Sequence, residues 1–213
     1  MVKNNKFAIL NLYDDNIEYY AKYTEEINKI YANKYGYKYI LHKGSLDTER
    51  VINWSKILLL LDSMEKYPKI EWFWWLDSDA IITNMDITLE SIISMVNSNS
   101  IIITSKFGSV TNTGSFLIKN CDMSKQLLKE AYGMTQYLSH SISEEAAIER
   151  VLTVRYGKYY KHRSIVPNVK LNADLKTWES SNFILHLYNH NKNKCNTKTV
   201  LEIITEHYSK IGK

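Results

Sequence analysis

The chain has 213 residues, of which 45% are hydrophobic and 23% charged, and this is the composition of an ordinary globular protein with a sizeable core. Its net charge of +4 suits a phosphate-bearing ligand but excludes the dense basic surface of a nucleic-acid-binding protein. No stretch approaches the roughly 20 apolar residues of a membrane span, and the N-terminus lacks the apolar segment of a signal peptide. Two cysteines, Cys121 and Cys195, make no disulfide framework and indicate a reducing compartment. We therefore expect a cytoplasmic protein without a transmembrane segment.

The first half of the chain alternates short apolar runs with segments of helical periodicity. The expected elements are a strand at Phe7–Leu12, a helix capped by Asp14, Asp15 and Asn16 and stopped by Gly36, a strand at Tyr37–Leu41, a helix at Asn53–Tyr67, a strand at Ile70–Leu76, a helix at Thr88–Asn97 capped by Thr88, and a strand at Ser100–Thr104. This alternation predicts an α/β fold with a mostly parallel sheet flanked by helices.

The second half of the chain is more mixed. It predicts a strand at Gly114–Ile118, helices at Asp122–Leu138 and Ser143–Tyr156, a strand at Phe183–Leu187 and a helix at Thr197–Ser209. No long linker or internal repeat divides the chain. We therefore expect one domain over residues 1–213, with a donor half over about 1–105 and an acceptor half over about 106–213.

An aromatic run, Trp72–Leu76, leads directly into two carboxylates, Asp77 and Asp79. In open α/β sheets ligands collect beyond the carboxyl ends of the strands, which is where these carboxylates fall. Two unpaired carboxylates would repel each other and raise one pKa, and a divalent cation such as Mn²⁺ or Mg²⁺ removes that conflict. A solvated acidic turn, or the metal site of a phosphatase or polymerase, would have the same spacing.

Several segments together resemble glycosyltransferase family 34, which includes plant xyloglucan xylosyltransferases and fungal galactosyl- and mannosyltransferases. They are YANKYGYKY (31–39), WSKILLLLDSMEKYPKIEWFWWLDSDAIITNMDI (54–87), NTGSFLIKNCDMSKQLLKEAY (112–132), EEAAIERVL (144–152) and HLYNHNKNKC (186–195). The pattern WxKxxxL…WxWWxDSDAxxT, followed by NTGSFLIxN, is specific. The short length is similar to that of the capsid-glycosylating enzymes of large algal viruses, which would act in the host cytoplasm.

The resemblance implies a GT-A fold, a Rossmann-like sheet that binds a UDP-sugar donor and Mn²⁺, with Mg²⁺ as the alternative ion. Asp77 and Asp79 match the DXD motif that holds the metal, and Ser78 would lie near the ribose. The family's C-terminal histidine ligand matches His186, and a neutral imidazole suits Mn²⁺. The stretch after this histidine departs from the family pattern, so that His190 is a rival for the same role.

The resemblance also implies a set of donor-binding residues. The base and ribose would lie against the end of the first strand, where Tyr13 would stack on uracil. Lys56 matches a family lysine that pairs with the DXD carboxylates or a phosphate, and Lys192 or Lys194 would neutralise the leaving diphosphate. The full expected set is Leu10, Asn11, Tyr13, Lys56, Ser78, Asn112, Thr113, Gly114, Lys192 and Lys194.

Two further carboxylates, Glu144 and Glu145, begin a predicted helix, where acidic residues are favourable for the helix dipole alone. The resemblance places them opposite the anomeric carbon as the catalytic pair, with Glu145 in place of the family's glutamine. A carboxylate there would stabilise oxocarbenium charge or act as a nucleophile, which gives retention, or act as a base, which gives inversion. We favour retention.

The sequence therefore predicts a metal-dependent glycosyltransferase that moves a hexose or deoxyhexose from a UDP-sugar to a hydroxyl of a glycan or glycoprotein. A nucleotidyl- or phosphotransferase that uses the aspartate pair for metals is the first alternative. A non-catalytic module that binds UDP or a glycan is the second.

Overall fold

The computed structural model describes residues 6–96, 100–106, 110–153, 157–188 and 199–211. The six strands of its main sheet, in spatial order, are β2 (Lys38–Lys43), β1 (Phe7–Tyr13), β3 (Trp72–Leu76), β6 (Val110–Lys119), β5 (Ile101–Lys106) and β7 (Arg163–Val166). All of them run in one direction except β6, which is antiparallel to both neighbours. The expected mixed, mostly parallel sheet is therefore confirmed.

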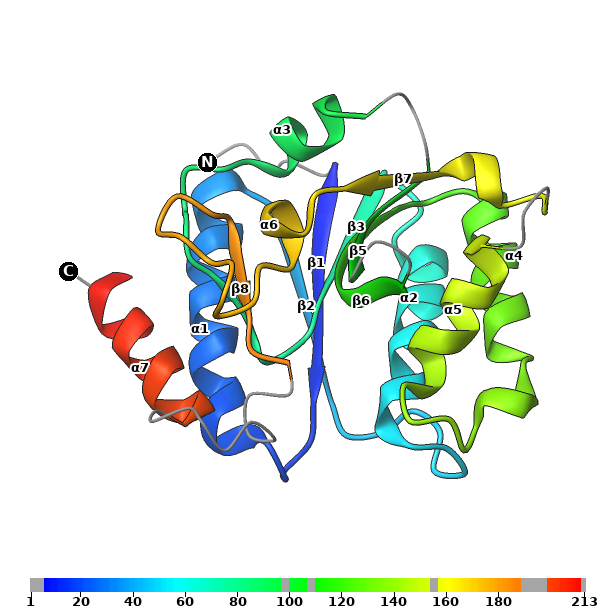
Figure 1. Ribbon diagram of the computed structural model, residues 1–213, viewed down its shortest axis with the longest axis horizontal. Helices are drawn as coiled ribbons and strands as arrows, with labels where there is room; N and C mark the ends of the chain where they lie inside the picture. Colours follow the sequence, from blue (N-terminus) through cyan, green and yellow to red (C-terminus); the bar gives the residue numbers. More distant parts are fainter. Residues whose placement is uncertain (1–5, 97–99, 107–109, 154–156, 189–198, 212–213) are drawn as a thin grey trace.

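Helices cover both faces of this sheet (Figure 1). They are α1 (Glu18–Tyr35), α2 (Ser55–Lys66), α3 (Leu89–Ser94), α4 (Asp122–Tyr132), α5 (Ser143–Thr153), α6 (Asn168–Leu171) and α7 (Val200–Ile211), with 3-10 turns at Ile52–Trp54, Thr135–Tyr137 and Tyr160–His162. None of these helices is both long enough and apolar enough to cross a membrane.

Successive side chains of a strand point to opposite faces of the sheet, so the central strands supply two hydrophobic cores. On β3, Trp72 and Trp74 pack on the face covered by α1 and α7, whereas Phe73 and Trp75 pack on the face covered by α2, α4 and α5. All four of these side chains are buried. The aromatic run is therefore a strand enclosed on both faces.

A second, two-stranded sheet lies beside the end of β3. Its strands, β4 (Ala80–Ile82) and β8 (Ile184–His186), are antiparallel, and Ala80 is the register partner of His186. Phe183, just before β8, stacks on Trp74 with ring centroids 5.1 Å apart. This packing brings the C-terminal part of the chain to the end of the aromatic strand.

The short strands β4 and β7 were not expected, because three or four residues are too few to establish a periodicity. The strand expected from Gly114 begins earlier, at Val110. The helix expected over Asp122–Leu138 ends at Tyr132, and Gly133 follows it.

The expected cap of α1 by Asp14, Asp15 and Asn16 is wrong. Ile17 takes the N-cap position, and its side chain makes no capping hydrogen bond. Asp14 instead accepts hydrogen bonds from the backbone and side-chain nitrogens of Asn16, at 3.1 and 2.9 Å. These acidic and amide groups therefore shape the turn between β1 and α1.

Two other expected helix boundaries are confirmed. Thr88 caps α3, since its hydroxyl accepts a hydrogen bond from the backbone nitrogen of Ser91 at 3.1 Å. Gly36 ends α1 in the left-handed conformation, with φ of 70°. A side chain at this φ brings Cβ close to the backbone carbonyl, which makes glycine the favoured residue.

Gly36→Ala is expected to lower the free energy of unfolding by about 1 to 2 kcal/mol, because alanine must adopt the left-handed conformation. Gly133→Ala is the matched control, because Gly133 has a φ of −70° and its new Cβ would meet only ordinary contacts at 3.5 Å. Urea unfolding of both variants measures the difference. Equal stabilities of the two variants would contradict the assigned backbone conformation.

Candidate active site

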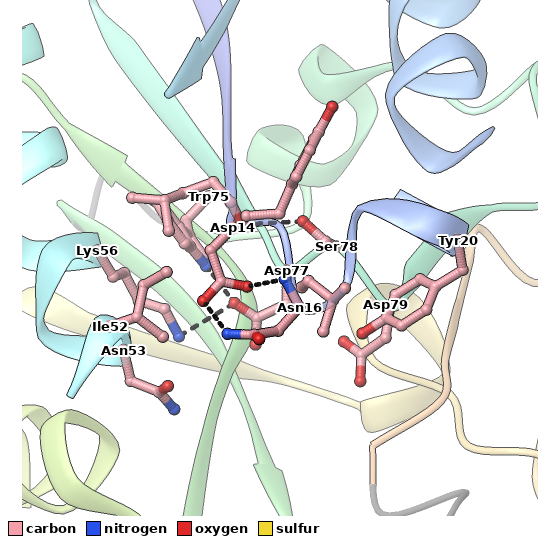
Figure 2. Close-up of a pocket in the computed structure, with 13 residues that line it drawn as sticks. Asp14, Asn16, Tyr20, Ile52, Asn53, Lys56, Trp75, Asp77, Ser78 and Asp79 are labelled. Atoms are coloured by element: carbon pink, nitrogen blue, oxygen red, sulfur yellow. Dashed lines mark hydrogen bonds and ion pairs between the residues drawn. The ribbon is translucent and has the colours of Figure 1, made fainter. Parts of the chain in front are cut away.

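A cavity of about 370 Å³ opens where β1 and β3 end. Its walls come from the β1–α1 turn, from α1 and from the start of α2, and its floor contains the Asp77–Asp79 turn (Figure 2). Figure 2 shows Asp77 between Lys56 on one side and Asp79 on the other. The site thus lies at the strand ends, as the sequence predicts.

Asp77 is held by three neighbours. The indole nitrogen of Trp75 donates a hydrogen bond to its Oδ1 at 2.6 Å, and the ammonium of Lys56 lies 3.2 Å from the same atom. The backbone nitrogen of Asp77 donates to the carbonyl of Gly114 on β6, at 2.7 Å. The aromatic strand therefore supplies a hydrogen-bond donor as well as a core.

Asp79 meets His186 from the second sheet. The Nε2 atom of His186 lies 3.2 Å from Oδ1 of Asp79 and 4.0 Å from Oδ2 of Asp77. Burial raises the pKa of Asp79, but the neighbouring His186 lowers it, and the net pKa is below the usual value. The imidazole of His186 is buried, whereas the side chains of Asp77 and Asp79 are 32% and 27% exposed. Two carboxylates from the turn between β3 and β4 therefore converge with an imidazole nitrogen from β8.

These three side chains fit a divalent metal ion. One ligand atom from each of Asp77, Asp79 and His186 lies within 4.8 Å of the others. Carboxylate oxygens with an imidazole nitrogen form a donor set that suits Mn²⁺, and oxygen donors also suit Mg²⁺. The rival ligand, His190, lies outside the described residues, as do Lys192 and Lys194.

Gly114 makes room for the histidine ring. A Cβ atom at this position would lie 1.9 Å from Cε1 of His186, closer than any side chain tolerates. The imidazole therefore fills the space on this side of Gly114. Close approach of the donor sugar to the Gly114 backbone stays a prediction.

Lys56 is buried at the centre of a charged cluster. Besides Asp77 it contacts Oε1 of Glu144 at 3.0 Å and the carbonyl of Thr113 at 3.1 Å. Burial lowers the pKa of Lys56, but the charges of Asp77 and Glu144 outweigh it and the net pKa is raised. The expected pairing of this lysine with a DXD carboxylate is present.

The two glutamates of α5 are also buried. Glu144 accepts a hydrogen bond from the hydroxyl of Ser143 at 2.8 Å. Glu145 accepts one from the backbone nitrogen of Thr113 at 3.0 Å and one from its hydroxyl at 3.3 Å. Neither glutamate lines the cavity. Their catalytic role stays a prediction, and the structure shows what fixes each carboxylate.

Asn11 and Ser78 connect the end of β1 to the DXD turn. The amide of Asn11 donates to the carbonyl of Leu76 at 2.8 Å and to the hydroxyl of Ser78 at 3.1 Å. Ser78 in turn donates to the carbonyl of Leu12 at 2.9 Å. Asn11 thus fixes the turn through the expected donor-binding residue Ser78, which lines the cavity.

The other expected donor-binding residues differ in their placement. Leu10 lies in the core on the α2 face and does not line the cavity, so its part in donor binding stays a prediction. Tyr13 lines the cavity, but its hydroxyl donates to Glu25. Stacking of Tyr13 on uracil stays a prediction. Asn112 is fully buried, and its Nδ2 has no hydrogen-bond partner within the described part of the chain.

Three site residues were missed by the sequence analysis. Tyr20 of α1 points its hydroxyl toward Asp79 (Figure 2), and burial followed by this charge raises its pKa. Trp75 contacts Asp77, and Asn172 contacts His186. The two aromatic residues were hidden in apolar patterns, and an isolated asparagine carries no sequence signal.

Comparison with known proteins gives an independent test. The sequence model of the galactosyl transferase GMA12/MNN10 family matches residues 11–99, which include the DXD turn. This match confirms the resemblance. The parts of the described site that lie outside this match are β6, α5, Asn172 and β8.

Relatives of this family have much longer chains. The probable xyloglucan 6-xylosyltransferase 3 of Arabidopsis thaliana is 34% identical over 110 residues, which are 47% of this chain and 24% of the relative. An alpha-1,2-galactosyltransferase of Schizosaccharomyces pombe is 26% identical over 181 residues, covering 67% of this chain and 48% of the relative. The chain thus spans between a quarter and a half of the length of these relatives.

Solved structures confirm the GT-A fold. A glycosyltransferase involved in the glycosylation of the major capsid of PBCV-1 matches with a TM-score of 0.68 and 18% identity, over 97% of this chain and 99% of that one. The galactosyltransferase LgtC, in complex with donor and acceptor sugar analogs, matches with a TM-score of 0.62 and 9% identity, over 95% of both chains. The fold therefore extends across nearly the whole chain.

Gly114→Ala is expected to displace the His186 ring and to lower the free energy of unfolding by about 1 to 3 kcal/mol, as overpacking does. A crystal structure and urea unfolding measure the two effects. His186→Ala provides the control, because Gly114→Ala added to that background should cost little once the ring is gone. An equal loss of unfolding free energy in both backgrounds would show that Gly114 does not accommodate the ring.

Lys56→Met is expected to lower the free energy of unfolding by about 3 to 5 kcal/mol, because it leaves the buried carboxylate of Glu144 without its cation. Adding Glu144→Gln should recover part of the loss, since a neutral amide is easier to bury. A double-mutant cycle by urea unfolding measures the coupling. Additive effects would contradict a direct charge pair.

Proposed function

We propose that the protein is a metal-dependent glycosyltransferase, which moves a sugar from a UDP-sugar to a hydroxyl of a glycan or glycoprotein. The convergence of Asp77, Asp79 and His186 at the cavity carries this proposal. The family match over residues 11–99 and the GT-A fold support the reaction class. The structurally similar PBCV-1 glycosyltransferase is involved in glycosylation of a capsid, which is consistent with a glycoprotein acceptor.

Asp77, Asp79 and His186 would hold the metal, with Mn²⁺ as the proposed ion and Mg²⁺ as the alternative. When bound, such a cation neutralises negative charge that develops on a leaving diphosphate. Lys56 and Trp75 fix one oxygen of Asp77. This arrangement leaves the second oxygen, Oδ2, on the side that faces His186.

The cavity would take the nucleoside diphosphate part of the donor. It lies beside the DXD turn and is lined by Ser78 and by the aromatic residues Tyr13, Tyr20 and Trp75. Aromatic faces and a hydroxyl suit a base and a ribose. A diphosphate bound there would have protein on one side, and partial loss of its water would strengthen the interaction of its charge with cations in the site.

The glutamates of α5 would act on the sugar. Glu144 is tied to Lys56, and Lys56 is tied to Asp77, so that the proposed metal ligand and the proposed catalytic pair belong to one network. Glu145 is fixed by two hydrogen bonds from Thr113. A carboxylate held at this position suits stabilisation of positive charge on the anomeric carbon and transfer with retention.

UDP release from a panel of UDP-sugars, with Mn²⁺ and without it, tests the reaction class and the donor together. Slow hydrolysis of one UDP-sugar only with Mn²⁺ is the expected result. A protein that neither binds UDP nor releases it would contradict the proposal. Tight Mn²⁺-dependent UDP binding without turnover, also after addition of glycan acceptors, would favour a non-catalytic binding module.

Asp79→Asn is expected to abolish Mn²⁺-dependent UDP binding while the thermal unfolding midpoint stays close to that of the wild type. The amide is a weaker metal ligand than the carboxylate and leaves the turn intact. Isothermal titration calorimetry with UDP, with and without Mn²⁺, is the measurement. Asp86→Asn is the control, since Asp86 is exposed and pairs with Lys34 on the surface. Unchanged metal dependence in Asp79→Asn would refute the metal assignment.

A further inference from the structure

Asn172, which follows α6, contacts the buried nitrogen of the histidine ring. Its Oδ1 lies 2.9 Å from Nδ1 of His186, on the side of the imidazole away from Asp79. Asn172 is fully buried. It lies outside the residues matched by the family model, and no sequence pattern marks it.

The orientation of the Asn172 amide is fixed by its other contacts. Its Nδ2 donates to the backbone carbonyl of Ser115 at 2.8 Å and to the hydroxyl of Thr104 at 2.9 Å. A carbonyl oxygen can only accept, so the amide nitrogen must face Ser115. A flipped amide would place two acceptor oxygens against each other. The oxygen of Asn172 is therefore the atom that faces His186.

This orientation determines the tautomer of His186. An amide oxygen is only an acceptor, so Nδ1 of the ring must carry the proton and donate it to Asn172. In the neutral ring Nε2 then carries the lone pair, and Nε2 is the atom that lies 3.2 Å from Asp79. The ring thus presents an electron pair to the same space as the two carboxylates.

Such an arrangement is unfavourable unless something positive lies between these atoms. A lone pair on Nε2 repels the carboxylate oxygens of Asp77 and Asp79, and either a proton on Nε2 or a cation removes the repulsion. The imidazole packs against the backbone of Gly114 and against the ring of Tyr188, whose centroid is 5.0 Å away. These contacts restrict its rotation. The contacts around His186 therefore hold a metal-ligating tautomer in place.

We propose that Asn172 is a positioning residue that fixes His186 as the Nδ1-protonated tautomer and so directs Nε2 at a divalent cation on Asp77 and Asp79. This inference rests on the proposed metal dependence. Hydrogen bonds from a ligating histidine to a second group fix ring orientation, and their loss typically weakens metal binding about 10- to 100-fold.

The first test reads the tautomer in the metal-free protein, at a pH high enough that the imidazole of His186 is neutral. Two-bond ¹⁵N–¹H correlation NMR of ¹⁵N-histidine-labelled protein distinguishes the two neutral forms, and His186→Gln assigns the signal. The wild type is expected to show the Nδ1-protonated form, and Asn172→Ala a mixture containing the Nε2-protonated form. An Nε2-protonated wild type, or an unchanged tautomer in Asn172→Ala, would overturn the proposal.

The second test measures Mn²⁺ affinity in the presence of UDP, by the electron paramagnetic resonance signal of free Mn²⁺. Asn172→Ala is expected to weaken Mn²⁺ binding about 10- to 100-fold. Asn172→Asp keeps an acceptor for Nδ1, although its second oxygen meets the carbonyl of Ser115 and lowers stability. The folded Asn172→Asp variant is expected to bind Mn²⁺ more tightly than Asn172→Ala. Equal weakening in both variants would overturn the positioning role.

Asn120→Ala is the matched control for a lost asparagine. Asn120 donates to backbone carbonyls of Met64, Tyr67 and Ile70 at the other end of β6 and makes no contact with His186. Its Mn²⁺ affinity is expected to equal that of the wild type. If it falls as far as in Asn172→Ala, general destabilisation explains the effect and the proposal fails.

The two proposals fail in different ways. A wild type that binds no Mn²⁺ would contradict the proposed function and, with it, the positioning role. A wild type that binds Mn²⁺ normally, together with an Asn172→Ala variant of equal affinity, would contradict the role of Asn172 alone. If Asn172→Ala does not fold, the wild-type tautomer still decides the question.

Discussion

The site depends on the compensation of negative charge at the end of one buried strand. Asp77, Asp79 and Glu144 carry three carboxylates, and the cations against them are Lys56 and, when protonated, His186. With a neutral histidine, these five side chains leave two negative charges uncompensated. A divalent cation would offset that excess, which is larger still when the buried carboxylate of Glu145, also close to Lys56, is counted.

The fold positions these charges through strands that are far apart in sequence. The aromatic strand β3 carries the DXD turn and supplies the indole of Trp75 to Asp77. The antiparallel strand β6 supplies a carbonyl to Asp77 and the bare face of Gly114 to the histidine. The small sheet of β4 and β8 then places His186 over that face. Because these contacts come from β3, β6 and β8, the proposed metal ligands are held by strands of both sheets.

Much of this arrangement could be predicted from the sequence. The apolar run before Asp77 and Asp79 located a strand end, and alternation of strands and helices gave the fold class. His186 came from the family resemblance, since a single histidine in a strand has no specific pattern. The direction of β6 could not be predicted, because an apolar run does not encode whether its pairing is parallel. The same limit hid Asn172, whose importance depends on three contacts made only after folding.

Anomalous diffraction from a crystal soaked in Mn²⁺ and UDP tests the central claim most directly. The account predicts a single strong manganese peak bonded to Asp77, Asp79 and Nε2 of His186, with the diphosphate on its open side. A peak at other residues, or a structure with UDP bound in the cavity and no manganese beside these three side chains, would contradict it.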